Sequence, residues 1–179
     1  NGSDIVGDLK QLAYETRLEG NLVMTTAYLN AAYRINSQLP DTSYSQYDLL
    51  IELSDSSLDA KLFSLASRFL NEELKFIESD VDKMNHAFRL ASYYVLKKDY
   101  LSAEETYNSI FLLDSNIMSN KELASLHLRI AQMASRQSAW DRSESHLHKA
   151  LEFDNLSPLL LDGVNNLRAT NLINQSKYE

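Results

Sequence analysis

Histidines and carboxylates are the side chains of this 179-residue chain whose spacing could do chemistry. His146 and His148 are two residues apart, which places them on roughly opposite sides of a helix, whereas metal ligands on one helix need a spacing of three or four. Glu144 and His148 do have a spacing of four, but an acid and a histidine so placed are more often a surface pair. We therefore expect no metal site.

The remaining titratable groups have structural interpretations. The acidic cluster at residues 72–82 spans the end of one expected helix and the start of the next, where carboxylates complement the amide dipoles. His86 and His127 each fall early in an expected helix. The sequence contains no cysteine, no glycine-rich phosphate loop, no nucleophile elbow and no HExxH motif. We therefore expect no catalytic residue and no cofactor, and predict that the chain is not an enzyme.

Composition narrows the fold and the partners. The chain is 44% apolar and 23% charged, enough for a core, and its 4 glycines and 2 prolines are too few for an all-β protein rich in hairpins. A net charge of −8 repels nucleic acid and anionic membranes. No apolar run approaches the roughly 20 residues that a membrane span needs, and no signal peptide is visible. The compartment stays undecided.

An internal repeat organises the chain. The stretch LASYYVLKKDYLSAEETYNSIFLLD, residues 90–114, carries small residues at Ala91 and Ala103 among large apolar ones. When this stretch is aligned with the sequence 40 residues later or 78 residues earlier, similar residue types fall at the same positions. Ala91, Tyr100 and Ala103 align with Ala131, Trp140 and Ser143 in the later segment, and with Ala13, Leu22 and Thr25 in the earlier one. Such periods indicate stacked supersecondary units.

Helix signals recur throughout. Apolar residues repeat every three or four positions, and no segment alternates with period two. Helix starts are indicated by Ser43 with Gln46, Ser79 with Asp82, Ser119 with Glu122, Ser138 with Asp141, and Ser157 before Pro158. We predict an all-α fold with helices at residues 4–18, 21–37, 43–54, 57–77, 80–97, 100–113, 120–137, 140–153 and 158–175.

The small residues then have a packing role. Antiparallel helices approach within about 8 to 10 Å only where a crossing side chain is small. We predict that Ala91 and Ala103 are those crossing points, with Tyr100 packed back over the first helix.

Residues 90–116 resemble a tetratricopeptide repeat. They have a small residue late in the first helix, an aromatic residue at the turn, an alanine early in the second helix and a closing Leu-Asp. Ser115 stands where the family usually has proline. Units near 84–117, 124–157 and 6–39 match this pattern, whereas 41–78 is a degenerate unit in which Ala60 is the candidate small residue and Asp48 falls where another belongs.

The resemblance implies an α-solenoid of about four and a half helical hairpins over residues 1–179, forming a right-handed superhelix. Residues 158–179 would be a partial unit, with Ala169 aligned to Ala131 and Tyr178 to Trp140. The partial unit is either a terminal cap or a sign that the chain is a fragment of a longer protein. The aligned aromatic residue favours a fragment.

The resemblance also implies a concave groove lined by the first helix of each unit. The groove residues would be Lys10, Tyr14 and Arg17, then Asn85, Phe88, Ser92 and Val95, then Gln132, Ser135 and Arg136, and finally Asn166, Thr170 and Asn174. Amides, aromatics and scattered cations suit an extended peptide. Phe88 and Val95 have the alternative of being core residues.

Three functions stay open from the sequence. The leading prediction is a non-catalytic scaffold that binds a protein or peptide segment in the groove. The first alternative is a regulatory or sensor module of a larger enzyme, signalling or export protein. The second is homo-oligomerisation through residues 158–179, whose leucines would expose apolar surface.

Overall fold

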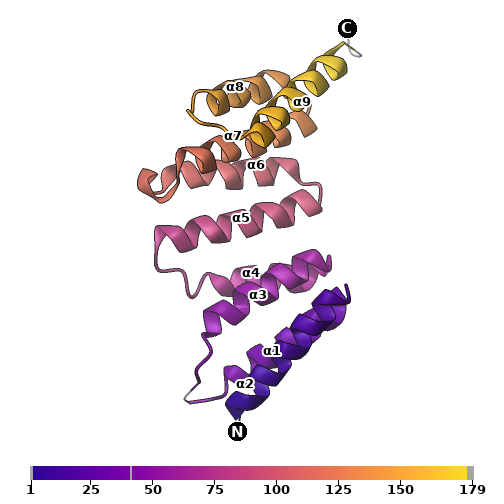
Figure 1. The fold of residues 1–179 in the computed structure, drawn as a ribbon, viewed down its shortest axis with the longest axis vertical. Helices are drawn as coiled ribbons and strands as arrows, with labels where there is room; N and C mark the ends of the chain where they lie inside the picture. The colour runs from indigo at the N-terminus through magenta and orange to yellow at the C-terminus, as the bar shows by residue number, and fades with distance from the viewer. Residues whose placement is uncertain (1, 41, 177–179) are drawn as a thin grey trace. The chain divides into compact units, whose positions relative to one another are not determined.

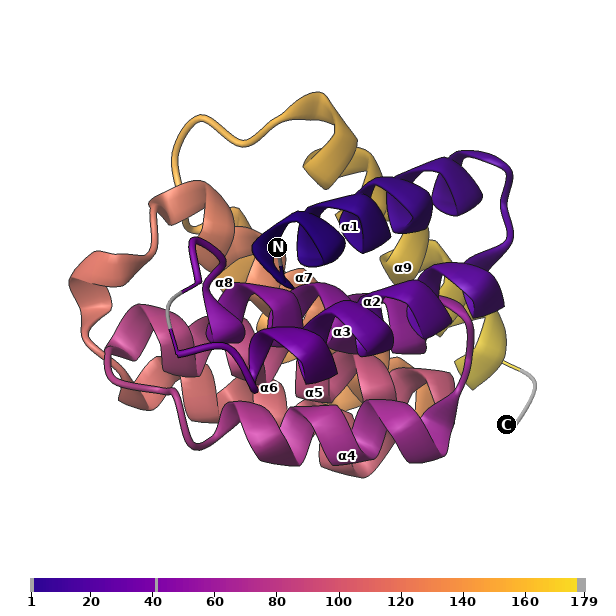
Figure 2. The same ribbon diagram turned by 90° about the horizontal axis from the view of Figure 1, so that it is seen from below.

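A computed structural model describes residues 2–40 and 42–176 of the chain. All regular structure in these residues is helical, which confirms the predicted all-α class. The chain forms two compact units, divided between Glu78 and Ser79. Figure 1 and Figure 2 show the helices of each unit joined by turns and short loops.

Unit 1 contains four helices that pack consecutively. They are α1 (Gly2–Leu18), α2 (Leu22–Asn36), α3 (Gln46–Asp59) and α4 (Phe63–Glu73). The core of this unit is apolar, and each of the four helices contributes buried residues to it from one face. Its buried residues are Val6, Ala13, Leu29, Ala32, Tyr33, Leu49, Leu50, Leu53 and Phe69.

Unit 2 contains α5 (Asp80–Leu96), α6 (Tyr100–Ser109), α7 (Asn120–Arg136), α8 (Trp140–Leu151) and α9 (Pro158–Gln175). Two short 3-10 turns, η1 (Ile110–Leu112) and η2 (Ser115–Ile117), lie between α6 and α7. Consecutive helices pack on one another, and α9 contacts both α8 and α7. One core lies among α5, α6 and α7, and a second one lies among α7, α8 and α9.

One turn geometry recurs four times. Gly20, Lys61, Lys98 and Ser138 have φ values of 76°, 55°, 61° and 58° and each sits between the two helices of a hairpin. In each case the next residue donates its backbone N–H to the carbonyl oxygen five residues back, at 2.8 to 2.9 Å. The turns follow one another at intervals of 41, 37 and 40 residues. Residues 2–40 and 42–176 therefore contain four helical hairpins with the same connection.

The shared turn fixes which residues are equivalent. Seven residues before the left-handed position and five residues after it, the side chain is small and buried in all four hairpins. These residues are Ala13, Ser54, Ala91 and Ala131 on the first helices, and Thr25, Ala66, Ala103 and Ser143 on the second, with 0 to 3% exposure. Small side chains at both crossing positions allow close helix approach. Ala91 and Ala103 lie where the sequence predicts them.

The second hairpin corrects the sequence prediction. Its turn lies at residues 60–62, so the expected helices 43–54 and 57–77 are wrong at that junction. Ala60 is the half-buried C-cap residue of α3, and Asp48 is exposed in its first turn. Ser54 is the small crossing residue instead. A gapless shift of 37 residues, which places Ser54 under Ala91 and Ala66 under Ala103, is the signal that identifies this register.

Helix starts follow the predicted capping signals at three of five sites. Capping boxes form at Ser79 with Asp82 and at Ser119 with Glu122, and Ser157 caps α9 before Pro158. The start predicted at Ser43 lies two residues later, where Ser45 accepts from the N–H of Asp48. Ser138 is not a cap, because it occupies the left-handed turn position.

Candidate functional site

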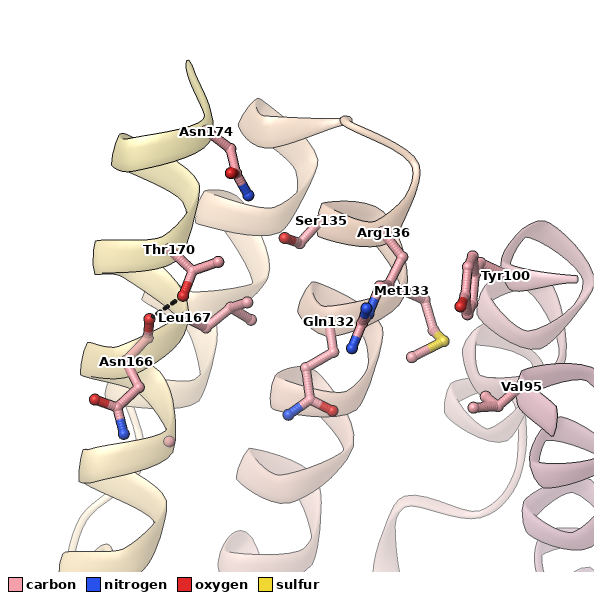
Figure 3. A pocket seen from close by; sticks show the side chains of 11 residues that line it. Val95, Tyr100, Gln132, Met133, Ser135, Arg136, Asn166, Leu167, Thr170 and Asn174 are labelled. Carbon is pink, nitrogen blue, oxygen red and sulfur yellow. Dashed lines mark hydrogen bonds between the residues drawn. The ribbon is translucent and has the colours of Figure 1, made fainter. Parts of the chain in front are cut away.

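A pocket of about 660 Å³ lies in unit 2 between α7, α9 and the junction of α5 with α6. Figure 3 shows Gln132 and Arg136 of α7 between the α9 side chains and the pair Val95 and Tyr100. Its lining residues are Val95, Tyr100, Gln132, Met133, Ser135, Arg136, Gly163, Asn166, Leu167, Thr170 and Asn174. The pocket therefore combines three amides, hydroxyls and one guanidinium with apolar side chains.

A second pocket, of about 410 Å³, lies further toward the N-terminus of α7. Gln132 lines both pockets, so the two hollows adjoin along α7. The lining residues of the second pocket are Lys121, Ser125, Leu128, Arg129, Gln132, Ser157, Leu159 and Leu160. We call the surface formed by the two pockets together the α7–α9 groove.

A buried hydrogen-bond chain holds α9 beside α7 and α8. The side chain of Asn171 is 3% exposed, accepts from the Ser135 hydroxyl at 2.6 Å and donates to the Ser143 hydroxyl at 2.8 Å. Ser143 in turn donates to the Ala131 carbonyl at 2.9 Å. Because buried polar groups need hydrogen-bond partners, these three hydrogen bonds set the position of α9 along α7.

Further contacts support the same placement of α9. Arg168 donates to Glu144 of α8 at 2.6 Å. Gly163 faces Leu128, and a Cβ atom there would lie 2.9 Å from a Leu128 methyl carbon, so an alanine would require that methyl group to shift. The walls of the groove are thus fixed by residues from three helices.

The register predicted for α9 is wrong. Ala169, expected to be the counterpart of Ala131, is exposed, whereas Asn171 is buried. Asn171 follows Ala131 by 40 residues, the same interval that separates Ala91 from Ala131. The small residue of the repeat is replaced here by a polar side chain with buried partners. Tyr178, the other aligned residue, lies outside the described residues.

Several predicted groove residues come together in unit 2. Gln132, Ser135, Arg136, Asn166, Thr170, Asn174 and Val95 all line the larger pocket. The Ser135 hydroxyl is engaged by Asn171, and Thr170 donates to the Asn166 carbonyl at 2.8 Å within α9. Gln132 and Arg136 are exposed.

The predicted α5 residues behave differently. Asn85, Phe88 and Ser92 do not line either pocket of the groove. Phe88 packs against the core of unit 2, with its ring centroid 6.0 Å from that of Tyr107. Ser92 donates to the Phe88 carbonyl at 2.9 Å, and Asn85 is exposed. Val95 also packs on the core, so the packing interpretation of Phe88 and Val95 is supported.

The predicted residues of unit 1 form a separate set. Lys10 makes an ion pair with Glu52 of α3 at 2.8 Å, and its ammonium lies 5.6 Å from the Tyr44 ring centroid. Tyr14 is 58% exposed, and Arg17 is exposed in the last turn of α1. Lys10 therefore has a structural role within its unit.

A partly buried histidine pair, in which His127 is buried and His146 is half-buried, was not predicted from the sequence. The Nδ1 atoms of His127 in α7 and His146 in α8 lie 2.9 Å apart, so one ring donates and the other accepts. His127 is 9% exposed and stacks on Phe111, with centroids 4.7 Å apart. Burial, followed by the charges of His146 and Lys149, lowers the pKa of His127 from 6.5 to about 4. Burial, followed by Lys149 and Arg142, also lowers the pKa of His146.

The Glu144–His148 pair matches the sequence interpretation, whereas Glu73 of the acidic cluster is fully buried. His148 lies 3.5 Å from Glu144 on the surface of α8, as the spacing of four predicts. Among residues 2–40 and 42–176, no three histidine or acidic side chains are gathered as metal ligands.

Comparison with known proteins gives this chain no family. No family model matches it, and no curated protein has a detectably similar sequence. Among the helices described, none combines the length and apolar character needed to cross a bilayer.

Proposed function

We propose that this protein is a non-catalytic interaction module that binds an extended segment of another protein in the α7–α9 groove. The observation that carries the proposal is the larger pocket, where exposed amides line a hollow with apolar walls. Amide side chains both donate and accept, so they can pair with the backbone of a peptide whatever its sequence. Met133, Leu167 and Val95 supply apolar contacts for its side chains.

We also propose that the four hairpins belong to a tetratricopeptide-like solenoid with a right-handed superhelix. The recurring left-handed turn and the eight small crossing residues support this proposal, because stacked repeats keep such positions constant. In that architecture the first helix of each hairpin faces the binding groove, and α7 is such a helix.

Selection from a displayed library of random twelve-residue peptides tests the binding proposal. The immobilised chain is compared with the Gln132→Ala/Asn166→Ala variant, which removes two exposed amides of the pocket. A matched variant, Gln38→Ala/Asn71→Ala, removes two exposed amides of unit 1. We expect peptides that are enriched by the wild-type chain and the matched variant and lost by the pocket variant. Failure to enrich any peptide, or equal enrichment by all three, would refute the proposal.

A second candidate function is self-association through α9. Leu159, Leu172 and Ile173 are 82%, 66% and 58% exposed, which is unusual for apolar side chains gathered on one helix. Deleting α9 is a poor test, because Leu160, Val164 and Asn171 are buried in the unit. The Leu172→Ser/Ile173→Ser variant keeps these contacts. Sedimentation of the wild-type chain as a dimer and of the variant as a monomer would support association, and two monomers would exclude it.

A further inference from the structure

Three cations follow one face of α7. Lys121, Arg129 and Arg136 all line the α7–α9 groove, together with Ser125 and Gln132. The spacing of these five residues is four, four, three and four, which keeps them on one face of a helix. This face of α7 therefore lines the groove from Lys121 to Arg136.

These cations have no acidic partner among the described residues. Lys121 and Arg136 make no ion pair or hydrogen bond with any described residue. Arg129 lies over the Phe88 ring, with its guanidinium carbon 6.0 Å from the ring centroid. Arg142 and Arg168, also in unit 2, are paired with Glu104 and Glu144. Lys98 and Lys149 of unit 2, which do not line the groove, also lack an acidic partner among the described residues, so what distinguishes this face is that its cations gather in one hollow.

The charge of the groove is opposite to that of the chain. The chain has 25 acidic and 17 basic residues, yet neither pocket of the groove is lined by an aspartate or a glutamate. Charges of one sign in a hollow attract a ligand of the other sign and repel like-charged ones. The groove is therefore complementary to carboxylates.

We propose that the segment bound in the α7–α9 groove is an acidic peptide whose carboxylates meet Lys121, Arg129 and Arg136. This inference rests on the proposed function and adds the class of partner. Arginine pairs with a carboxylate through two parallel hydrogen bonds, and Gln132 between the cations can hold the intervening peptide backbone.

The geometry of α7 sets the spacing of the carboxylates. At a rise of 1.5 Å per residue, Lys121 and Arg129 are about 12 Å apart along the helix, and Arg129 and Arg136 about 10 Å. An extended peptide advances about 3.3 Å per residue, so the matching acidic residues are about three to four positions apart. Residues between them meet Leu128 and Leu167, which line the groove.

The composition of the selected peptides tests this inference. The displayed random library is selected on the wild-type chain and on the Lys121→Gln/Arg129→Gln/Arg136→Gln variant. The Arg34→Gln variant, which removes an exposed cation of unit 1, is the matched control. The most enriched peptide and its Glu→Gln or Asp→Asn version are then measured by fluorescence anisotropy at low and high salt.

We expect enriched peptides with acidic residues three or four positions apart, bound by the wild-type and control chains and lost by the triple variant. Each single Gln substitution should weaken binding about twofold to fivefold, the range for exposed ion pairs, and added salt should weaken it further. Neutralising the peptide should have the larger effect, because it removes all the pairs at once.

Four results would overturn the inference. Peptides without acidic residues that still require Gln132 and Asn166 would leave the binding function standing and refute the acidic partner. Acidic peptides retained by the triple variant would place their site elsewhere. Equal competition by a single-stranded DNA oligonucleotide would show attraction to any polyanion. If no peptide is enriched, the proposed function and this inference fail together.

Discussion

Acidification should destabilise unit 2 through His127. The unfolded chain binds a proton at this histidine near pH 6.5, whereas in the folded protein, where burial disfavours the charged ring, the pKa is about 4. Between these values the unfolded state binds more protons, so stability falls as pH falls through the window. The contribution is fully present above pH 6.5 and is lost progressively toward pH 4.

The magnitude follows from the shift. Each unit of pKa difference corresponds to about 1.4 kcal/mol, so His127 should cost the folded state about 2.5 kcal/mol at about pH 4.5. This is a large part of the stability of a small domain. In urea unfolding it should lower the midpoint by roughly 1 to 2.5 M between about pH 7.5 and pH 4.5.

Trp140 provides the assay, because it is the one tryptophan of the sequence and opens α8 in unit 2. Urea unfolding is followed by its fluorescence in the wild-type chain, in His127→Leu, and in His148→Gln as the control at an exposed histidine. The carboxylates titrate in all three proteins, so the difference between them reports on His127 together with its partner His146. His127→Leu should lose less stability on acidification than the other two. Equal losses in all three would refute the reasoning.

Three smaller predictions concern the helix crossings. Ala91→Leu overpacks a fully buried position and should cost about 1 to 3 kcal/mol, whereas an unchanged thermal melt would contradict the crossing. Ser54→Ala should raise the melting temperature, because the buried Ser54 hydroxyl has no partner among the described residues; a lower one would show that the hydroxyl is needed. Asn171→Ala should cost about 1 to 3 kcal/mol in urea unfolding, because the Ser135 hydroxyl loses its acceptor and the Ser143 hydroxyl loses a donor, whereas Thr170→Ala, at an exposed position, should cost less.

The sequence predicts the hairpins well where side-chain size is constant. Ala91 and Ala103 stand among large residues, and the same contrast identifies the first and fourth hairpins. The second hairpin is harder, because serine replaces alanine at position 54 and serines surround it. The residue types at the turns do not predict where the turns lie. Lys61, Lys98 and Ser138 adopt a conformation that usually indicates glycine or asparagine, so their types do not reveal it.

The candidate site was predictable in part. The polar stripe of α7 has a helical spacing in the sequence, and extending it from Gln132 and Arg136 to Lys121 and Arg129 would have found the second pocket. Asn171 could not be found in this way, because a buried amide looks like a surface residue until its partners are known. The His127–His146 pair depends on how α7 and α8 face each other, which spacing along one helix does not contain.

The recurring turn has a consequence for how the protein folds. Within each hairpin the two helices are joined by a connection of a few residues, so the first tertiary contacts close only short loops. Chains dominated by such local contacts fold quickly, and folding can begin in any hairpin and spread to its neighbour. The order of events should therefore follow the relative stability of the hairpins rather than their position along the chain. On the ribosome, by contrast, the order of synthesis allows the α1–α2 hairpin to form before α3 is complete.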